Sequence, residues 1–375
     1  MAMLDMAGPS PALKLTALVL LVALLPLSWW WLRQRAASSR ARLAALTALT
    51  LFLTFDLIVF GAFTRLTDSG LGCPDWPGCY GQASPLGAQA DIHAAQQAMP
   101  SGPVTWTKAW IEMLHRYLAM VVGLLILVAA VFSWRVRARL PHSPWWALAT
   151  LAWVIVQGLF GKYTVTLKLY PAVVTLHLLG AVLLLVLLVR QHESFADRPL
   201  PPGLPRGPVL AVLALVLGQI ALGGWVSTNY AVLACRGFPD CNGAWWPAMD
   251  AAHGFTLLRE LGRAGHGGYL PFEALVAIHM AHRLFAVVAV GGLVWLMLRL
   301  RREPAAPYRR YAGLLAALVL AQVATGLSNV VLDWPIAAAL AHSGGAAALV
   351  GVLSSLLARL RPAAGPVAAR AAQPA

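Results

Sequence analysis

Long apolar runs separated by short polar segments constrain this chain more than any other feature. A helix needs about 20 residues to cross the roughly 30 Å hydrocarbon core of a bilayer, and eight runs reach that length. They lie near 43–63, 113–134, 145–166, 172–189, 208–229, 274–298, 311–332 and 336–358. A ninth apolar run lies at 15–32. Its arginines come after the run instead of before it, and it has no small-residue cleavage site. We therefore expect an additional N-terminal helix and no cleaved signal peptide.

The composition agrees with a protein embedded in a bilayer. Hydrophobic residues make up 59% of the 375 residues, charged residues make up 11%, and the mean hydropathy is +0.71. A net charge of +14 would also suit nucleic-acid binding, but the basic residues gather between or after apolar runs. Their segments are 33–42, 135–139, 190–206, 299–310 and the tail from Arg359. The positive-inside rule places these segments in the cytoplasm and the long loops at 64–111 and 230–273 outside, so we predict no nucleic-acid partner.

The two halves of the chain repeat each other. Gly61 and the first cysteine pair recur 162 residues later, at Gly223 and the second pair. The polar positions that also recur are His115-Arg116 as His282-Arg283, Gln157 as Gln322, and His177 as His342. Four spans return the chain to its starting side, so the halves have parallel orientation.

This pattern predicts an all-α integral membrane protein with two tandem four-helix transmembrane bundles related by a pseudo-twofold parallel repeat. The predicted divisions are an extra N-terminal helix with a cytoplasmic basic loop (1–42), a first half (43–190), a cytoplasmic linker (191–207), a second half (208–358) and a cytoplasmic tail (359–375).

All four cysteines lie in the two outside loops, and each pair encloses five residues. The pairs are Cys73 with Cys79 and Cys235 with Cys241. In an oxidising extracytoplasmic compartment this pattern favours two local disulfides. A redox-active dithiol is a second interpretation. A zinc site is the weakest, because the C-x2-C spacing is absent.

Five of the ten histidines lie at span ends or inside spans, namely His115, His177, His279, His282 and His342. Ionisable groups at membrane depth are costly and usually functional. On the predicted topology, His115 and His177 begin two spans of the first half from the outside, and His282 and His342 do the same in the second half. Two imidazoles at one depth can ligate an iron porphyrin from both faces. The pattern predicts two bis-histidine haem sites, because a bare transition-metal site would have too few ligands.

The repeat breaks at Glu112, which occupies the position of His279 in the second half. Glu112 precedes His115 by three residues and so shares its helix face. There it would act as a proton acceptor or electrostatic stabiliser, unless it is only a capping or interfacial carboxylate. Arg116 and Arg283 could pair with haem propionates or extend to the interface. A single carboxylate predicts that the first half performs chemistry while the second carries electrons.

At these residues the chain closely resembles haem A synthase, the membrane enzyme that oxidises a methyl group of haem O to the formyl group of haem A. The resemblance covers about 43–358. It rests on the stretch GAFTRLTDSGL at 61–71, on the E-x-x-H-R motif from Glu112 to Arg116, and on three further histidines, His177, His282 and His342.

The resemblance implies a role for each of these residues. In that family the first half holds the substrate haem O, here through His115 and His177, and Glu112 is required for oxidation. The second half holds a haem b cofactor, here through His282 and His342. The cysteine pairs resemble those of a family subgroup.

The implied reaction is two successive oxidations of the methyl group, followed by dehydration of a geminal diol. The oxygen would come from O2 or from water. Further implied are the bacterial cytoplasmic (inner) membrane with its lipids, contact with haem O synthase and cytochrome oxidase assembly factors, and a homo-oligomer.

Two other functions fit parts of the pattern. A di-haem b-type electron carrier could link quinol to the outside cysteine pairs, but it gives no reason for Glu112 to differ from His279. A transporter also fits a parallel repeat, but the polar groups lie at helix ends and not at the midplane.

Overall fold

The structure, a computed structural model, describes residues 10–140, 143–265 and 268–360. Most of the predicted tail and the first nine residues of the predicted N-terminal segment lie outside these ranges. The described residues form eleven α-helices and one single-turn 3-10 helix, with isolated β-bridges but no strand. The α-helices are α1 (Pro11–Gln34), α2 (Ser39–Leu66), α3 (Gln89–Ala98), α4 (Trp106–Arg135), α5 (Trp145–Thr166), α6 (Pro171–Ala196), α7 (Arg206–Thr228), α8 (Ala251–Gly254), α9 (Phe272–Arg302), α10 (Ala306–Val331) and α11 (Ile336–Arg359).

Nine of the helices in the described ranges are long and apolar enough to cross a membrane. They coincide with the eight predicted spans and the additional N-terminal run, which confirms the all-α membrane class. Most extend past the apolar run that predicted them. The largest extensions are at the start of α4 and at the end of α6. Helix α6 enters the predicted 191–207 linker and ends where Asp197 adopts a left-handed conformation (φ 50°).

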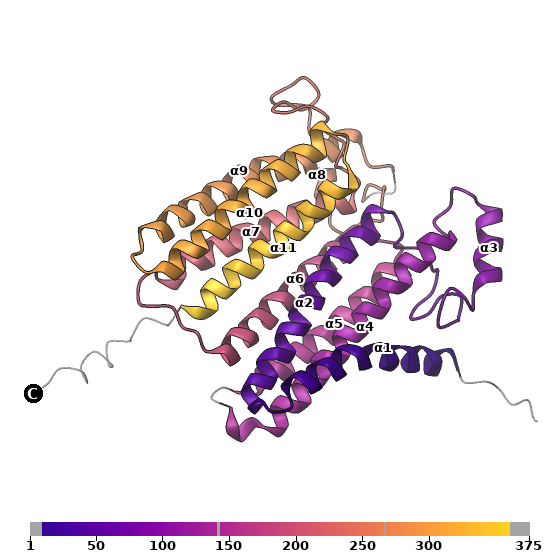
Figure 1. The fold of residues 1–375 in the computed structure, drawn as a ribbon. Coiled ribbons are helices and arrows are strands. Elements are labelled where there is room, and N and C mark those ends of the chain that lie inside the picture. The colour runs from indigo at the N-terminus through magenta and orange to yellow at the C-terminus, as the bar shows by residue number, and fades with distance from the viewer. Residues whose placement is uncertain (1–9, 141–142, 266–267, 361–375) are drawn as a thin grey trace, which may run out of the picture.

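Figure 1 shows the long helices as two neighbouring groups. In the first, α2 and α5 each pack against both α4 and α6. In the second, α7 and α10 each pack against both α9 and α11. Each group is a four-helix ring, so α4 lies diagonally opposite α6, and α9 lies diagonally opposite α11. Helix α1 lies outside the first ring, against α2 and α4.

The two rings meet along α2, α6, α7 and α11. The packing of α6 against α7 is matched by that of α11 against α2, as a twofold relation requires. At the end of α2, the Arg65 side chain donates to the Ser227 carbonyl at 2.5 Å and stacks over the Tyr230 ring. The Tyr230 hydroxyl donates to Asp68 at 2.5 Å. Asp68 and Tyr230 are repeat equivalents, and burial raises the Tyr230 pKa, so its hydroxyl stays a donor at neutral pH.

The two cysteine loops share one local structure. Disulfides join Cys73 to Cys79 and Cys235 to Cys241, as the spacing favoured. After each disulfide come two residues of positive φ, Tyr80-Gly81 and Asn242-Gly243, and a short antiparallel bridge closes each turn. Two positive φ values in succession are the backbone of a type I′ turn, in which glycine carries no side-chain penalty. The short helices α3 and α8, in the long loops, were not predicted.

Gly72 holds the first cysteine loop close against α4. A Cβ atom at this position would lie 2.4 Å from the Lys108 carbonyl carbon and 2.6 Å from the Ala109 nitrogen. Both are backbone atoms of a helix and cannot move aside as a side chain can. The loop therefore docks on α4 only because residue 72 has no side chain.

We expect Gly72→Ala to destabilise the protein by about 1–3 kcal/mol, the usual cost of overpacking. Thermal unfolding in detergent, followed by size-exclusion chromatography, measures the loss. Gly123→Ala is the matched control, because a Cβ at this glycine of α4 meets no atom within 4 Å. Equal stability of the two variants would show that the loop is not docked as described.

Candidate functional site

The first histidine pair lies on diagonally opposite helices of the first ring. His115 is in α4 and His177 is in α6, two helices that both border α2 and α5. The two imidazoles are close enough to interact electrostatically. The Phe60 ring of α2 stacks parallel to the His115 ring, with centroids 6.2 Å apart. A diagonal pair points into a ring from two sides, as a flat ligand between the helices requires.

The second pair has the same placement in the second ring. His282 is in α9 and His342 is in α11, and the two imidazoles again interact electrostatically. The structure therefore brings together the histidines that the repeat had paired.

Each of the four histidines faces a glycine of a neighbouring helix. A Cβ atom on Gly61 would lie 3.1 Å from His115 Cε1, and one on Gly161 would lie 3.7 Å from His177 Cε1. In the second half the corresponding distances, from Gly223 to His282 and from Gly326 to His342, are 3.0 and 3.1 Å. The four glycines form two pairs of repeat equivalents, Gly61 with Gly223 and Gly161 with Gly326. The small residue is therefore part of the histidine site and not of general helix packing.

These observations fit an iron porphyrin better than a bare metal ion. Within the ranges that the structure describes, no group of three or more His, Cys, Asp or Glu side chains could hold a metal ion. A porphyrin supplies four nitrogen ligands itself and needs only one axial group on each face. The diagonal placement of the histidines matches that requirement.

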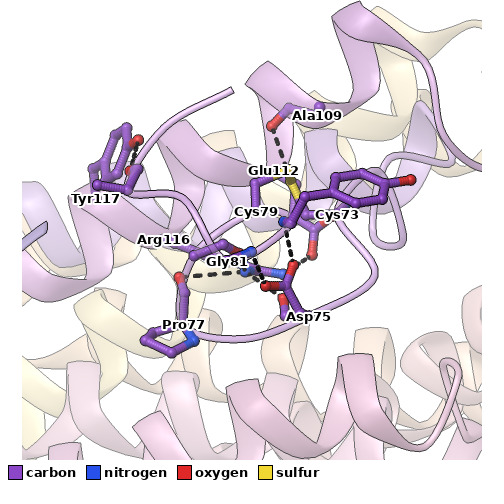
Figure 2. Close-up of a disulfide and its surroundings, with 12 residues drawn as sticks. Cys73, Asp75, Pro77, Cys79, Gly81, Ala109, Glu112, Arg116 and Tyr117 are labelled. Carbon is purple, nitrogen blue, oxygen red and sulfur yellow. Dashed lines mark hydrogen bonds and ion pairs between the residues drawn. A yellow bond between two sulfur atoms is a disulfide. The ribbon is translucent and has the colours of Figure 1, made fainter. Parts of the chain in front are cut away.

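Glu112 lies buried between α4 and the first cysteine loop (Figure 2). The residue is 3% exposed. One carboxylate oxygen accepts the backbone N–H of Cys73 at 2.8 Å, and the other accepts the Arg116 guanidinium at 2.5 Å. The Cys73 sulfur lies 3.9 Å from the Ala109 carbonyl of α4. The carboxylate that breaks the repeat is therefore joined directly to the disulfide loop.

Arg116, four residues after Glu112 in α4, anchors the same loop. Figure 2 shows its guanidinium reaching into the loop, where it donates to the carbonyl oxygens of Asp75 and Gly78 at 2.8 and 2.5 Å. Together with the Glu112 ion pair, these bonds engage the guanidinium almost completely inside the protein. The predicted contact with haem propionates stays a prediction, and it would have to share a guanidinium that the loop already binds.

The second half anchors its loop without a carboxylate. Arg283 donates to the Asp240 and Cys235 carbonyls at 2.9 and 3.1 Å. His279 stands where Glu112 stands in the first half, and its Nδ1 lies 3.0 Å from the Ala231 carbonyl. Arg283 therefore anchors its loop without a carboxylate four residues before it on its own helix, which sets Glu112 apart as a special feature of the first half.

Two polar contacts to the histidines were missed by the sequence analysis. Gln219 contacts the His282 ring, and Thr325 contacts the His342 ring. Neither residue has a polar equivalent in the first half, so a search for recurring residues passed over them. A search for positions where one copy is polar and the other apolar would have found both.

The fold and these sites define a multi-pass, all-α membrane protein with two histidine pairs and one buried carboxylate. The chain belongs to the COX15-CtaA family of cytochrome oxidase assembly proteins, which it matches over residues 44–354. It is 38% identical over 321 residues to the heme A synthase of Shewanella oneidensis, a match that covers 84% of this chain and 96% of that protein.

More distant relatives carry the same name. The heme A synthase of Allorhizobium ampelinum is 29% identical over 340 residues, covering 84% of this chain and 90% of its own length. That of Halalkalibacterium halodurans is 27% identical over 305 residues, covering 76% and 86%. The resemblance predicted from the motifs is confirmed.

The ion pair predicts strong coupling between Glu112 and Arg116. Arg116→Met would leave a buried carboxylate without its cation and should destabilise the protein by about 3–5 kcal/mol. Adding Glu112→Gln removes that charge, so the double variant should lose less stability than the two single losses together. Chemical denaturation in detergent measures the free energy of unfolding of the two single variants and of the double variant.

Arg283→Met is the matched control, because the Arg283 guanidinium binds loop carbonyls and no carboxylate. Combined with Glu112→Gln, it should give additive losses. Additive losses for Arg116→Met with Glu112→Gln would contradict the buried ion pair.

Proposed function

We propose that this chain is a haem A synthase that oxidises the methyl group of haem O to a formyl group. The observation that carries the proposal is the asymmetry within a duplicated site: both halves present a diagonal histidine pair, but only the first adds a buried carboxylate. The relatives named heme A synthase support the same activity. They give no support to a di-haem electron carrier.

In this proposal the first half binds the substrate. His115 and His177 hold the iron of haem O, and the glycines opposite them leave space beside the rings. Conversion of a methyl group to a formyl group removes four electrons in two oxidation steps, through a geminal diol that loses water. With water as the oxygen donor, four protons are also released.

Glu112 is the group positioned to accept a proton during these steps. Its carboxylate is held by Arg116 and by the Cys73 N–H, so it cannot turn freely toward solvent. Protonation would weaken its ion pair with Arg116, and the cysteine loop would remain anchored by the Arg116 bonds to carbonyl oxygens. Glu112 can thus change charge without releasing the loop.

The second half is the proposed cofactor site. His282 and His342 would hold haem b, which supplies one-electron redox chemistry when bound. The disulfides, in this proposal, keep each loop compact above its bundle. The protein would act in the cytoplasmic membrane of a bacterium and receive haem O from haem O synthase. Product transfer to cytochrome oxidase assembly factors and homo-oligomerisation are further parts of the proposal.

Haem analysis tests this function. In a host that makes haem O but no haem A, expression of the chain should yield extractable haem A, identified by chromatography and mass. Glu112→Ala should leave haem bound but abolish the formyl product, because the proton acceptor is lost. Glu273→Ala, which removes an exposed carboxylate at the start of α9, should have no effect. Recovery of unaltered haem O and no haem A from wild-type protein with both sites occupied would refute the activity.

The membrane orientation has its own test. The basic segments predict that α3 lies outside the cell and that the α4–α5 connection lies in the cytoplasm. A membrane-impermeant maleimide should therefore label Ala94→Cys in intact cells, but should label Ala138→Cys only after permeabilisation. Both positions are exposed, so access alone decides the result. The reverse pattern would invert the proposed topology.

A further inference from the structure

Each histidine of the second pair is held by a polar side chain from an adjacent helix. Thr325 Oγ1 of α10 lies 3.0 Å from His342 Nδ1. The Gln219 amide nitrogen of α7 lies 3.1 Å from His282 Nδ1 and also donates to the His282 carbonyl at 3.2 Å. The Thr325 hydroxyl thus fixes the orientation of the His342 ring, while Gln219 contacts the His282 ring and holds the backbone of His282.

The Thr325 contact also fixes the tautomer of His342. A hydroxyl has one proton to donate, and Thr325 donates it to the Ala321 carbonyl of its own helix at 2.7 Å. The hydroxyl oxygen must therefore accept a hydrogen bond from the N–H of His342 Nδ1. That tautomer leaves the lone pair of Nε2 free, as iron ligation by Nε2 requires.

The first pair has no such contacts. The alignment that pairs Gly61 with Gly223 places Leu57 at the position of Gln219. The alignment that pairs Gly161 with Gly326 places Phe160 at the position of Thr325. In the part of the chain that the structure describes, the buried Nδ1 atoms of His115 and His177 have no hydrogen-bond partner.

A glutamine present in both halves shows the same difference. In the second half, Gln322 donates to the His342 carbonyl at 2.9 Å. Its equivalent Gln157 is 7% exposed, and neither atom of its amide has a partner among the described residues. A buried polar group without a partner costs free energy. The first half thus leaves both histidine Nδ1 atoms and the Gln157 amide without partners among the described residues. The second half gives both histidine Nδ1 atoms and the Gln322 amide nitrogen a polar contact, and leaves the Gln219 amide oxygen open.

We propose that Thr325 and Gln219 are positioning residues that make the second half retain its haem, and that apolar Leu57 and Phe160 make the first half an exchanging site. A hydrogen bond that a ligating histidine donates raises its basicity and holds its ring in place, and loss of such a partner typically costs 10–100-fold in metal affinity. Thr325 accepts such a bond from His342, whereas Gln219 holds His282 through its backbone carbonyl. This inference rests on the proposed function, in which one haem is a resident cofactor and the other must leave as product.

Haem release can be measured for each half separately in the full-length protein. His115→Ala leaves the second site to bind haem, and His282→Ala leaves the first. Each purified variant is loaded with iron protoporphyrin IX in detergent, and transfer to excess apomyoglobin gives the dissociation rate. We expect release from the second site to be at least about tenfold slower than release from the first.

Within the His115→Ala background, Thr325→Val should accelerate release by about 10–100-fold. Gln219→Leu should accelerate it less, because Gln219 holds only the His282 backbone carbonyl by a donated bond. The electron paramagnetic resonance signal of the haem should also broaden, because the imidazole planes lose their fixed orientation. Thr325→Ser keeps the hydroxyl and should restore slow release. Ser328→Ala is the matched control: its hydroxyl makes the same type of bond within α10, to the Ala324 carbonyl, but touches no histidine.

The reciprocal change tests the first half. In the His282→Ala background, Phe160→Thr should slow haem release toward the rate of the second site. Equal release from the two wild-type sites would overturn the inference, as would unchanged release in Thr325→Val or an equal acceleration in Ser328→Ala. Haem A formation is scored separately in otherwise unaltered protein. If the two sites release haem at different rates but no haem A forms, only the proposed function is refuted. If haem A forms but the two sites release haem at equal rates, only this inference is refuted.

Discussion

The structure depends on one constraint: inside a bilayer, a polar group must find its partner within the protein. Backbone groups meet this requirement by forming helices, which accounts for the nine long apolar helices among the described residues. Polar side chains meet it less easily, so the few that lie within these helices carry information. In this protein several of them gather around two histidine pairs. Whether the histidine Nδ1 atoms have a polar partner separates the two halves more clearly than their shared helices do.

The Glu112 cluster shows how a costly group is accommodated. A carboxylate that is 3% exposed is stabilised by an arginine on the same helix and by a backbone N–H from the cysteine loop. That N–H reaches Glu112 because Gly72 lets the loop approach α4 and because the Cys73–Cys79 disulfide keeps the loop short. The loop and the carboxylate therefore form one unit. The second half keeps the loop, the disulfide and the arginine, so this framework persists without the acid.

Hydropathy and the internal repeat predicted much of this arrangement from the sequence. Apolar length located every long helix because the hydrocarbon thickness sets a narrow range of lengths. The repeat identified the histidine pairs because polar residues in membrane helices rarely recur without a function. The bonds from Arg116 to the Asp75 and Gly78 carbonyls could not be predicted, since they depend on how an irregular loop folds back over a helix. The ends of α6 and the short helices α3 and α8 depend on local backbone conformation that hydropathy does not report.

Duplication explains why the two sites are alike, but function requires them to differ in how firmly they hold a ligand. A site that satisfies its histidines in advance gains affinity, because ligand binding does not have to order the rings. A site that leaves His115, His177 and Gln157 without partners binds less tightly, and its open polar groups remain available to a substrate. In the proposed function, the exchanges of Leu57 for Gln219 and of Phe160 for Thr325 would achieve this difference without altering the helices or the facing glycines. Glu112 would then add chemistry to the half that releases its product.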